Sequence, residues 1–388
     1  MDLDLDEGRV ERLRHATDWL DANVPREPLA PMDTARGAEQ HRAWERRLAE
    51  DRWGVVHWPE KYGGRGYDLL DWLLFEEAYH ALGAPARINH NGITLLGSTL
   101  LEHGTSEQRE RLLPALVRGE TVWAQAWSEP EAGSDLASVR CRARRVDGGY
   151  LLSGQKIWSS RAVVADRAFG LFRSDPDSAR HRGLTYLMFD LHGDSVEVRP
   201  IRRFDGEPVF AEIFLDECFV PDVDVIGTPG EGWSVVMSTA ATERGVSLRS
   251  PGRFLATAGR LVELWRRLPQ DVQPEYAARV RGGWMRAQAY RMAGFLTAEG
   301  RLGVEESSTG KLFWSGLDID LHETALDIVD RLRLDGVDHD HLVGLDLDQV
   351  EMEWLSGYRF ALAGPIYAGT NQIQMNIIAE RLLGLARQ

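Results

Sequence analysis

Residues 125–135 read QAWSEPEAGSD, and this stretch decides the fold because it joins a strand-like segment to a loop of small and hydroxyl-bearing residues. Small side chains let backbone N–H groups approach a bound molecule closely. Further along the chain, residues 154–160 read GQKIWSS, a strand end that carries an aromatic ring and two hydroxyls. Each motif alone has an ordinary explanation, since a tryptophan is more often core and a hydroxyl-rich loop is usually a turn. Together they indicate a candidate ligand site in the middle of the chain.

The zone before this stretch is helical by its periodicity. Ala43, Trp44 and Leu48 recur at helical spacing among charged residues. Thr105 and Gln108 form a capping-box pattern ahead of an apolar run. The sequence therefore predicts helices from residue 8 to about residue 120, one of them beginning directly after Thr105.

From about residue 121 to residue 226 the period changes to two. Residues 137–144 alternate apolar and polar side chains, and Asp147-Gly148-Gly149 is typical of a hairpin turn. Further strands are predicted at 186–191 and 209–219. The turn-forming residues 227–230 close this β zone.

After Gly232 the helical spacing returns. Helices are predicted near residues 234–266, 273–299, 306–334 and 371–387, with an aspartate-rich connection at 335–348. The predicted fold class is α+β, mainly α. Its expected parts are an N-terminal helical domain (1–120), a middle antiparallel β domain (121–228) and a C-terminal helical bundle (229–388).

Composition excludes several classes of function. The net charge of −15 argues against nucleic acid, which is bound through cations that neutralise phosphates. No apolar run is long enough to span a membrane, and the acidic start lacks the features of a signal peptide. Two cysteines make neither a disulfide framework nor a four-cysteine zinc site, so we expect a cytoplasmic protein. The basic residues are arginines except for three lysines, which favours a bacterial source. Asp338-His339-Asp340-His341 is interpreted as a solvated loop, and no metal site is predicted.

The order SEP-x-AGSD followed by G-x-K-x-W resembles the acyl-CoA dehydrogenase family. Residues 367–374 (YAGTNQIQ) and 376–381 (NIIAER) support the resemblance, which extends from about Trp44 to the C-terminus. It implies an FAD-dependent dehydrogenase with an α-helical domain, a β-barrel-like middle domain and a C-terminal four-helix bundle.

The resemblance also implies the ligand contacts. The flavin side would be formed by Gln125, Trp127, Ser128, Ser134, Trp158, Ser160, Thr370 and Gln372. Trp158 would cover the isoalloxazine face away from the substrate, and Ser134 would lie where the FAD diphosphate and the substrate's pantetheine arm pass close together. The substrate side would be formed by Ser134, Arg244, Tyr367, Ala368 and Gly369. For Arg244, a structural ion pair or support of the active-site helix remains the alternative.

The catalytic base is the main departure from the commonest family pattern. Many members carry a glutamate where this chain has Ala368, which cannot accept a proton. A second family location lies at the start of the C-terminal domain, where residues 241–245 read ATERG. A lone helical glutamate is usually solvated surface, but the alanine at the other location favours Glu243 as the base. The implied reaction is α,β-dehydrogenation of an acyl-CoA or acyl-carrier-protein thioester to the trans-2-enoyl thioester, with Glu243 taking the α-proton and flavin accepting the β-hydride.

Two alternatives remain open from the sequence. One is a flavin-dependent oxidase or monooxygenase of the same superfamily, and the other is a non-catalytic subunit of a heteromeric dehydrogenase. The expected electron acceptor is an electron-transfer flavoprotein, and the expected assembly is a homodimer or homotetramer, with α2β2 possible. Residues 264–300 lack a clear match to the Arg-x-x-Phe-Gly segment with which family members reach a neighbour's adenosine. The position of the base favours a branched or bulky acyl chain.

Overall fold

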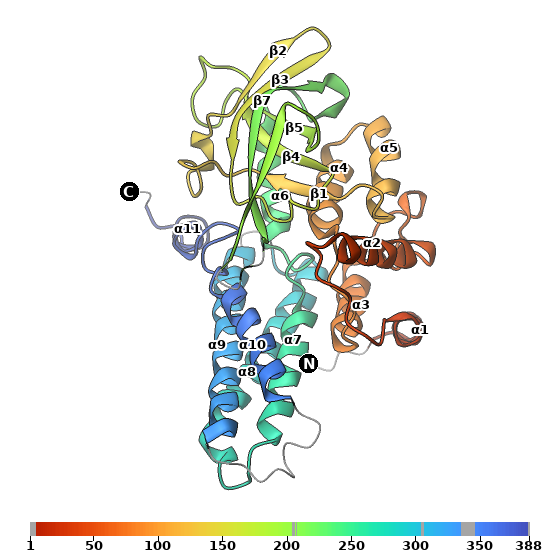
Figure 1. Cartoon of the computed structure of the whole chain (residues 1–388), viewed down its shortest axis with the longest axis vertical. Helices are drawn as coiled ribbons and strands as arrows, with labels where there is room; N and C mark the ends of the chain where they lie inside the picture. Colours follow the sequence, from red (N-terminus) through yellow and green to blue (C-terminus); the bar gives the residue numbers. More distant parts are fainter. Residues whose placement is uncertain (1–4, 204–205, 207, 304–305, 335–345, 387–388) are drawn as a thin grey trace. The chain divides into compact units, whose positions relative to one another are not determined.

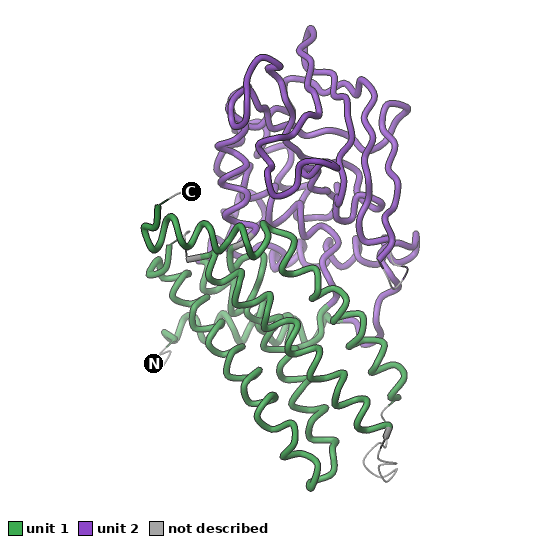
Figure 2. Tube along the Cα trace, turned by 90° about the vertical axis from the view of Figure 1, so that its left-hand side faces the viewer, with its two compact units in different colours: residues 1–24, 69–84, 244–388 green, residues 25–68, 85–243 purple. Residues whose placement is uncertain are grey.

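The protein forms two compact units, each assembled from separate stretches of chain (Figures 1 and 2). Unit 1 contains Met1–Val24, Leu69–Ala84 and Arg244–Gln388, and unit 2 contains Pro25–Asp68 and Pro85–Glu243. The computed structural model describes residues 5–203, 206, 208–303, 306–334 and 346–386. The three-part division predicted from the sequence follows chain order instead of packing, and its boundaries stay a prediction.

A single sheet forms the centre of unit 2. Among the described residues it has eight strands, in the order β6-β7-β3-β2-β4-β5-β8, with β1 pairing beside β4. The strands are β1 (Trp123–Ala126), β2 (Arg142–Val146), β3 (Gly149–Lys156), β4 (Arg167–Arg173), β5 (Leu184–Asp190), β6 (Val196–Ile201), β7 (Phe210–Pro221) and β8 (Val225–Ile226). Most neighbours are antiparallel, as predicted, but the β1–β4 and β2–β4 pairs are parallel.

The predicted hairpin is confirmed. Strands β2 and β3 pair with Val146 opposite Gly149, and Gly148 in the turn has a φ of 74° that favours glycine. The predicted alternation at 137–144 also appears in the burial of the side chains, since Ala137 and Ala143 are buried. The strand nevertheless begins only at Arg142, because Leu136–Ser138 forms a 3₁₀ turn.

The helices of unit 2 include the capping box predicted from the sequence. In α5 (Ser106–Val117), Gln108 donates its backbone N–H to Thr105 Oγ1 at 3.1 Å, and Thr105 donates its own to Gln108 Oε1 at 3.0 Å. The other helical segments are α2 (Ala35–Glu50), a 3₁₀ turn (Glu60–Tyr62), a π-helical turn (Gly92–Gly97), α4 (Ser98–His103), a 3₁₀ turn (Asp222–Asp224) and α6 (Gly232–Arg244). In α2, Trp44 and Leu48 are buried whereas Ala43 is exposed.

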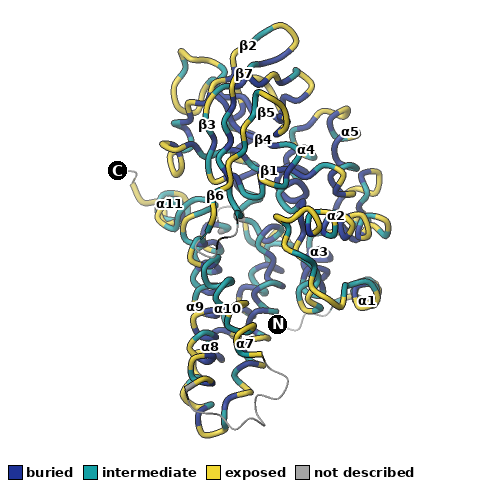
Figure 3. The backbone as a smooth tube through the Cα atoms, viewed as in Figure 1, coloured by how far each residue is buried: buried dark blue, intermediate teal, exposed yellow. Residues whose placement is uncertain are grey.

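Unit 1 is helical throughout its described part. Its helices are α1 (Glu7–Asn23), α3 (Leu69–Ala81), α7 (Pro251–Arg266), α8 (Gln273–Ala298), α9 (Glu306–Leu334), α10 (Leu347–Ala361) and α11 (Asn371–Ile377), which continues into a π-helical turn (Ile378–Leu382). Figure 3 marks the buried residues along the backbone of α7 and α9. Phe254 of α7 and Trp314 of α9 belong to one apolar core. No helix in the described ranges is long and apolar enough to cross a membrane.

Two helix predictions in this part of the chain were incomplete. The single segment predicted at 234–266 is wrong, because α6 ends at Arg244 and α7 begins at Pro251, with Ser250 capping the Gly252 N–H. A proline at the first helical position starts a helix well but does not continue one. Helix α10 was not predicted. The sequence Asp338-His339-Asp340-His341 lies outside the described residues.

Candidate active site

The end of β1 carries three of the predicted flavin contacts. Gln125 Nε2 is buried and has no hydrogen-bond partner within the described residues. Trp127 donates its indole N–H to the Tyr186 hydroxyl at 2.9 Å, and Ser128 accepts the Ile157 N–H at 2.9 Å. The last bond ties this loop to the second motif. A buried amide with an unmet donor is expected where a ligand completes the hydrogen bonding.

A buried ion pair fixes the loop that follows β1. Lys156 is fully buried, and its Nζ donates to Glu129 Oε1 at 2.8 Å, to the Leu171 carbonyl at 2.7 Å and to the Trp127 carbonyl at 3.2 Å. Glu129 accepts the backbone N–H groups of Arg140 at 2.6 Å and Cys141 at 2.9 Å. The lysine of G-x-K-x-W and the glutamate of SEP therefore have a structural role that joins the two motifs, which was not predicted from the sequence.

Acid is expected to weaken unit 2 through Glu129. Burial alone raises the pKa of this carboxyl, but Lys156 and the two backbone donors bring it below its ordinary value of 4.5. Because the folded-state pKa is depressed, the stabilisation is complete above the unfolded-state pKa and is lost as the pH falls through the folded-state value. Below pH 4.5, the free energy of unfolding in urea should therefore fall with pH more steeply in the wild type than in Glu129→Gln, by up to about 1.4 kcal/mol per pH unit. Equal slopes in the two proteins would contradict this assignment.

The second motif presents a large aromatic ring on a strained turn. Trp158 has a φ of 59° and is 56% exposed, and its ring meets the edge of Phe210 with centroids 5.9 Å apart. A tryptophan in the left-handed region is rare and costs about 1–3 kcal/mol, so its surroundings must impose it. Mutual backbone hydrogen bonds between Ser159 and Ala211 do so, at 3.0 and 3.1 Å. Ser160 follows, half-buried, with its carbonyl accepting from Asn91.

Glu243 lies in the last turn of α6, in unit 2 with the motifs above. Burial raises the pKa of Tyr186, its bonds to Trp127 and Thr239 lower that pKa, and the Glu243 charge raises it further. Trp127, Tyr186, Thr239 and Glu243 therefore belong to one neighbourhood. Thr239 also shares a 2.7 Å hydrogen bond with Thr99, which fixes α6 to α4. From the sequence, Tyr186 is predicted only as part of a strand, and no motif marks it.

Within unit 1, residues 367–372 form a second group of predicted contacts. Ala368 and Gly369 have φ values of 56° and 75°, and Gln374 Nε2 donates to both of their carbonyls at 3.2 and 3.3 Å. The φ of Gly369 favours glycine, and a Cβ added there would lie 2.5 Å from the Gln374 amide nitrogen and displace that side chain. Thr370 accepts the Ile373 N–H at 3.2 Å and thereby starts α11. The Ala368 N–H has no hydrogen-bond partner among the described residues.

The remaining predicted residues are less constrained. Ser134 lies exposed on the loop after β1, and Gln372 is exposed on α11. Tyr367 stacks on Trp314 with ring centroids 5.9 Å apart. Arg244 is the last residue of α6, and its side chain lies outside the described part of the chain. Unit 2 thus carries Gln125, Trp127, Ser128, Ser134, Trp158, Ser160 and Glu243, and unit 1 carries the residues from Arg244 onward.

The groups of unit 2 fit a planar cofactor with hydrogen-bonding edges. Gln125 supplies a buried donor without a partner among the described residues, and Trp158 supplies an exposed ring held on a strained backbone. Unit 1, taken by itself, presents at the turn of Ala368 and Gly369 a backbone N–H that no described residue accepts. An FAD molecule offers the acceptors and the flat surface that such groups match. Among the described residues, no three or more His, Cys, Asp or Glu side chains are grouped to hold a metal.

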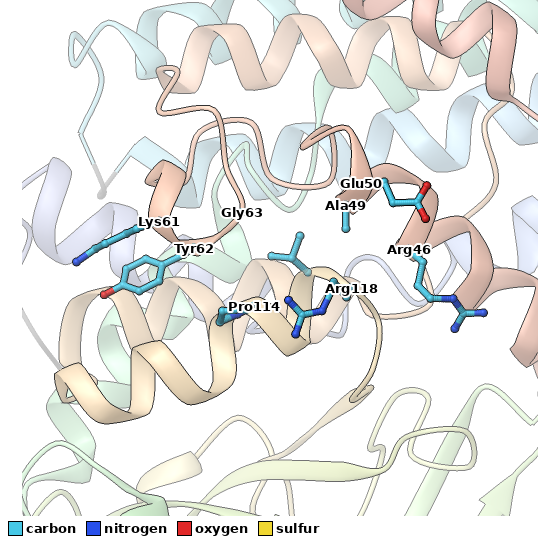
Figure 4. A pocket seen from close by; sticks show the side chains of 9 residues that line it. Arg46, Ala49, Glu50, Lys61, Tyr62, Gly63, Pro114 and Arg118 are labelled. Carbon is cyan, nitrogen blue, oxygen red and sulfur yellow. The ribbon is translucent and has the colours of Figure 1, made fainter.

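Unit 2 also contains a hollow that none of the predicted site residues lines (Figure 4). Its volume is about 310 Å³, and its walls are Arg46, Ala49, Glu50, Lys61, Tyr62, Gly63, Pro114, Val117 and Arg118. Lys61 is exposed there with its Nζ 4.6 Å from the centre of the Tyr62 ring. The two other lysines of the chain, Lys156 and Lys311, are fully buried.

Comparisons with known proteins agree with this geometry. The acyl-CoA dehydrogenase N-terminal, middle and C-terminal domains match residues 13–120, 124–218 and 230–383. A curated relative, acyl-CoA dehydrogenase IpdE1 of Mycobacterium tuberculosis, is 38% identical over 381 residues, which cover 95% of this chain and 96% of the relative.

Two solved structures share the fold. One, named Tcur3481-Tcur3483 steroid ACAD, has a TM-score of 0.84 at 24% identity and covers all of both chains. The other, the prolyl acyl carrier protein oxidase AnaB, has a TM-score of 0.77 at 21% identity and covers 98% of this chain and 100% of that one. With all three family domains matched in order over most of its length, the chain belongs to the acyl-CoA dehydrogenase family and is an FAD-dependent oxidoreductase.

Proposed function

We propose that the chain dehydrogenates an acyl thioester between Cα and Cβ, with Glu243 as the base that removes the α-proton. One observation carries the proposal: Glu243 belongs to the Trp127–Tyr186 neighbourhood, while residue 368 is an alanine without a carboxylate. A carboxylate whose charge acts on a buried tyrosine, itself bonded to a predicted flavin contact, is a better candidate for a base than a solvated helix residue.

Two groups of the chain would carry separate parts of the reaction, one stabilising the carbonyl oxygen and the other removing the proton. A thioester α-proton is weakly acidic, so the carbonyl oxygen must be stabilised as charge develops on it. The Ala368 N–H, which has no partner among the described residues, would donate to that oxygen, and the Gln374 bonds to the Ala368 and Gly369 carbonyls hold its peptide in place. Glu243 would then take the α-proton. FAD, when bound, supplies the acceptor for the β-hydride.

The proposed cofactor contacts follow the same positions. Gln125, Trp127 and Ser128 would line the flavin, Trp158 would cover the face away from the substrate, and Ser160 would lie near the ring's reactive nitrogen. Ser134, Thr370 and Gln372 would contact the remainder of FAD, with Ser134 also facing the substrate. Arg244, Tyr367 and Gly369 would complete the substrate side. The orphan Gln125 amide and the exposed Trp158 ring support the first two groups.

A bulky acyl group is the proposed substrate class. The position of the base in α6 matches the family subgroup that acts on branched or bulky chains, and one structural neighbour is named a steroid ACAD. Two partners follow from this function. An electron-transfer flavoprotein would reoxidise the flavin, and a second subunit, either a copy of this chain or a different one, would complete the adenosine side of the FAD site. The two-part name of the steroid ACAD supports the heteromeric form.

A second candidate keeps the fold and the base but changes the carrier and the acceptor. The similarity to the prolyl acyl carrier protein oxidase favours an acyl-carrier-protein thioester, with oxygen accepting the electrons. Such an enzyme would reduce oxygen rapidly after thioester oxidation, whereas a dehydrogenase would need a separate protein acceptor.

The proposal predicts that thioesters will bleach the flavin of the purified protein. Under anaerobic conditions, a bulky polycyclic acyl-CoA should reduce the oxidised-flavin absorbance within one turnover, and a short straight acyl-CoA should do so more slowly. Diode-array spectroscopy follows the bleaching, and admission of oxygen afterwards separates dehydrogenase from oxidase. If the holoprotein binds flavin and neither acyl-CoA nor acyl-carrier-protein thioesters bleach it, the proposed function is wrong. A colourless chain that gains flavin only with a partner would support the non-catalytic-subunit alternative.

A further inference from the structure

Arg249 is a half-buried cation with no acidic partner in the part of the chain that the structure describes. Its guanidinium carbon lies 4.7 Å from the centre of the Tyr367 ring and 5.3 Å from that of Trp314. Its Nε is buried without a hydrogen-bond partner, and no ion pair of this side chain occurs among the described residues. The backbone is fixed, because the Tyr290 hydroxyl donates to the Arg249 carbonyl at 2.9 Å. A preformed position for an unpaired charge is therefore built into unit 1.

Two other partly buried arginines of unit 1 have acidic partners. Arg253 bonds Asp318 at 2.5 Å, and Arg291 bonds Glu77 at 2.7 Å. Burial alone lowers the pKa of Arg253, but Asp318 and Tyr367 raise it above its ordinary value. Taking a cation out of water is costly, and folded proteins meet that cost with a partner. Arg249 differs from these two arginines in having no acidic partner among the described residues, and we expect a ligand to supply one.

The position of Arg249 beside Tyr367 suggests that its ligand is the substrate. Its ring partner Tyr367 directly precedes Ala368, whose N–H is the proposed donor to the thioester carbonyl. A glutamate at position 368 would put a negative charge beside this group, and the alanine removes it. The loop is also fixed on its other side, where Lys311 donates to Asn371 at 2.7 Å. The result is a positive position next to the proposed thioester site.

We propose that Arg249 binds a carboxylate carried by the acyl group of the substrate. This inference rests on the proposed function and names its substrate class: an acyl thioester with a second, anionic oxygen group. The guanidinium is suited to the task, because it offers planar paired N–H donors that match a carboxylate. Stacking on the Tyr367 and Trp314 rings leaves its edge for hydrogen bonds and restricts its rotamers.

The test compares matched thioesters on the holoenzyme. The probes are mono-CoA thioesters of dicarboxylic acids of increasing length, each paired with its methyl ester. For the wild type, kcat/KM should favour the free carboxylate at one length. In Arg249→Gln that preference should fall by about 10- to 100-fold, mainly through KM, while turnover of the ester stays near the wild-type value. Arg249→Lys should restore part of the preference. Arg279→Gln is the control, since Arg279 is an exposed residue of the same unit paired with Asp327.

Calorimetric titration of the same probes keeps the inference separate from the proposed function. If no thioester is turned over but the carboxylate probe binds the wild type at least tenfold more tightly than Arg249→Gln, the inference stands and the proposed reaction fails. Equal weakening of carboxylate and ester, or no preference in the wild type, would overturn the inference in favour of a packing role. Loss of flavin from Arg249→Gln, seen in the absorbance spectrum, would also overturn it, because the anion served would then be a cofactor phosphate.

Discussion

Replacing Glu243 with glutamine is expected to slow thioester-driven flavin reduction by about 100- to 10,000-fold, the usual size of a general-base effect. The amide keeps the shape of the side chain but cannot accept a proton. Residue 368 is alanine, so the other family location offers no substitute carboxylate. Anaerobic stopped-flow measurement of flavin bleaching gives the rate directly. Flavin content and thioester affinity should stay near their wild-type values, because the loss concerns the proton-transfer step.

Two matched variants sharpen this experiment. Glu231→Gln makes the same change at an exposed glutamate immediately before α6 and should leave the rate unchanged. Glu243→Asp retains a carboxylate at a shorter reach and should recover part of the rate. Near-normal turnover in Glu243→Gln would exclude this residue as the base. Equal losses in both glutamine variants would indicate a general effect of charge on α6.

Substituting Lys156 with methionine should destabilise the protein by about 3–5 kcal/mol, the cost typical of breaking a buried ion pair. The change would leave Glu129 buried without its cation and would remove the donor from the Trp127 and Leu171 carbonyls. Because Trp127 and Glu129 lie in the same loop, flavin affinity should fall too. Urea unfolding followed by fluorescence measures the stability, and flavin titration measures the affinity.

Lys61→Met supplies the matched control, since the same substitution at an exposed lysine should change stability by less than about 0.5 kcal/mol. Glu129→Gln should also be destabilising, and the double variant Glu129→Gln, Lys156→Met should lose less than the sum of the two single changes. Additive losses would show that the two side chains do not act as a pair. An unchanged unfolding midpoint in Lys156→Met would contradict the role assigned to this lysine.

Local signals in the sequence predicted the elements that depend on neighbouring residues. The Thr105–Gln108 capping box and the turn at Gly148 require only a few consecutive side chains, and both are present. The break between α6 and α7 was not predicted. Ser250 and Pro251 are typical of a helix start, but the apolar residues on both sides keep helical spacing and suggested one continuous helix. Helix α10 begins where the predicted connection at 335–348 ends, and no element was predicted for residues 349–361.

The candidate site was predictable only where a motif marks it. Gln125, Trp158 and Thr370 lie in recognisable patterns, but their roles depend on the resemblance. Tyr186 contacts Trp127 across the sheet, from a strand that pairs with β4, so no local pattern places it. Arg249 was missed for a similar reason, since its unpaired state is a property of packing around Trp314 and Tyr367.

The burial of two lysines limits how the chain can be attached to anything through side-chain amines. With Lys156 and Lys311 enclosed, an amine-reactive dye, surface or crosslinker should couple to the folded chain's lysine side chains at Lys61 alone. Attachment through Lys61 would hold the chain in one orientation on a sensor chip and would give one distance reference in crosslinking mass spectrometry. It would also place the attached group in the hollow beside Tyr62, where none of the proposed catalytic residues lies.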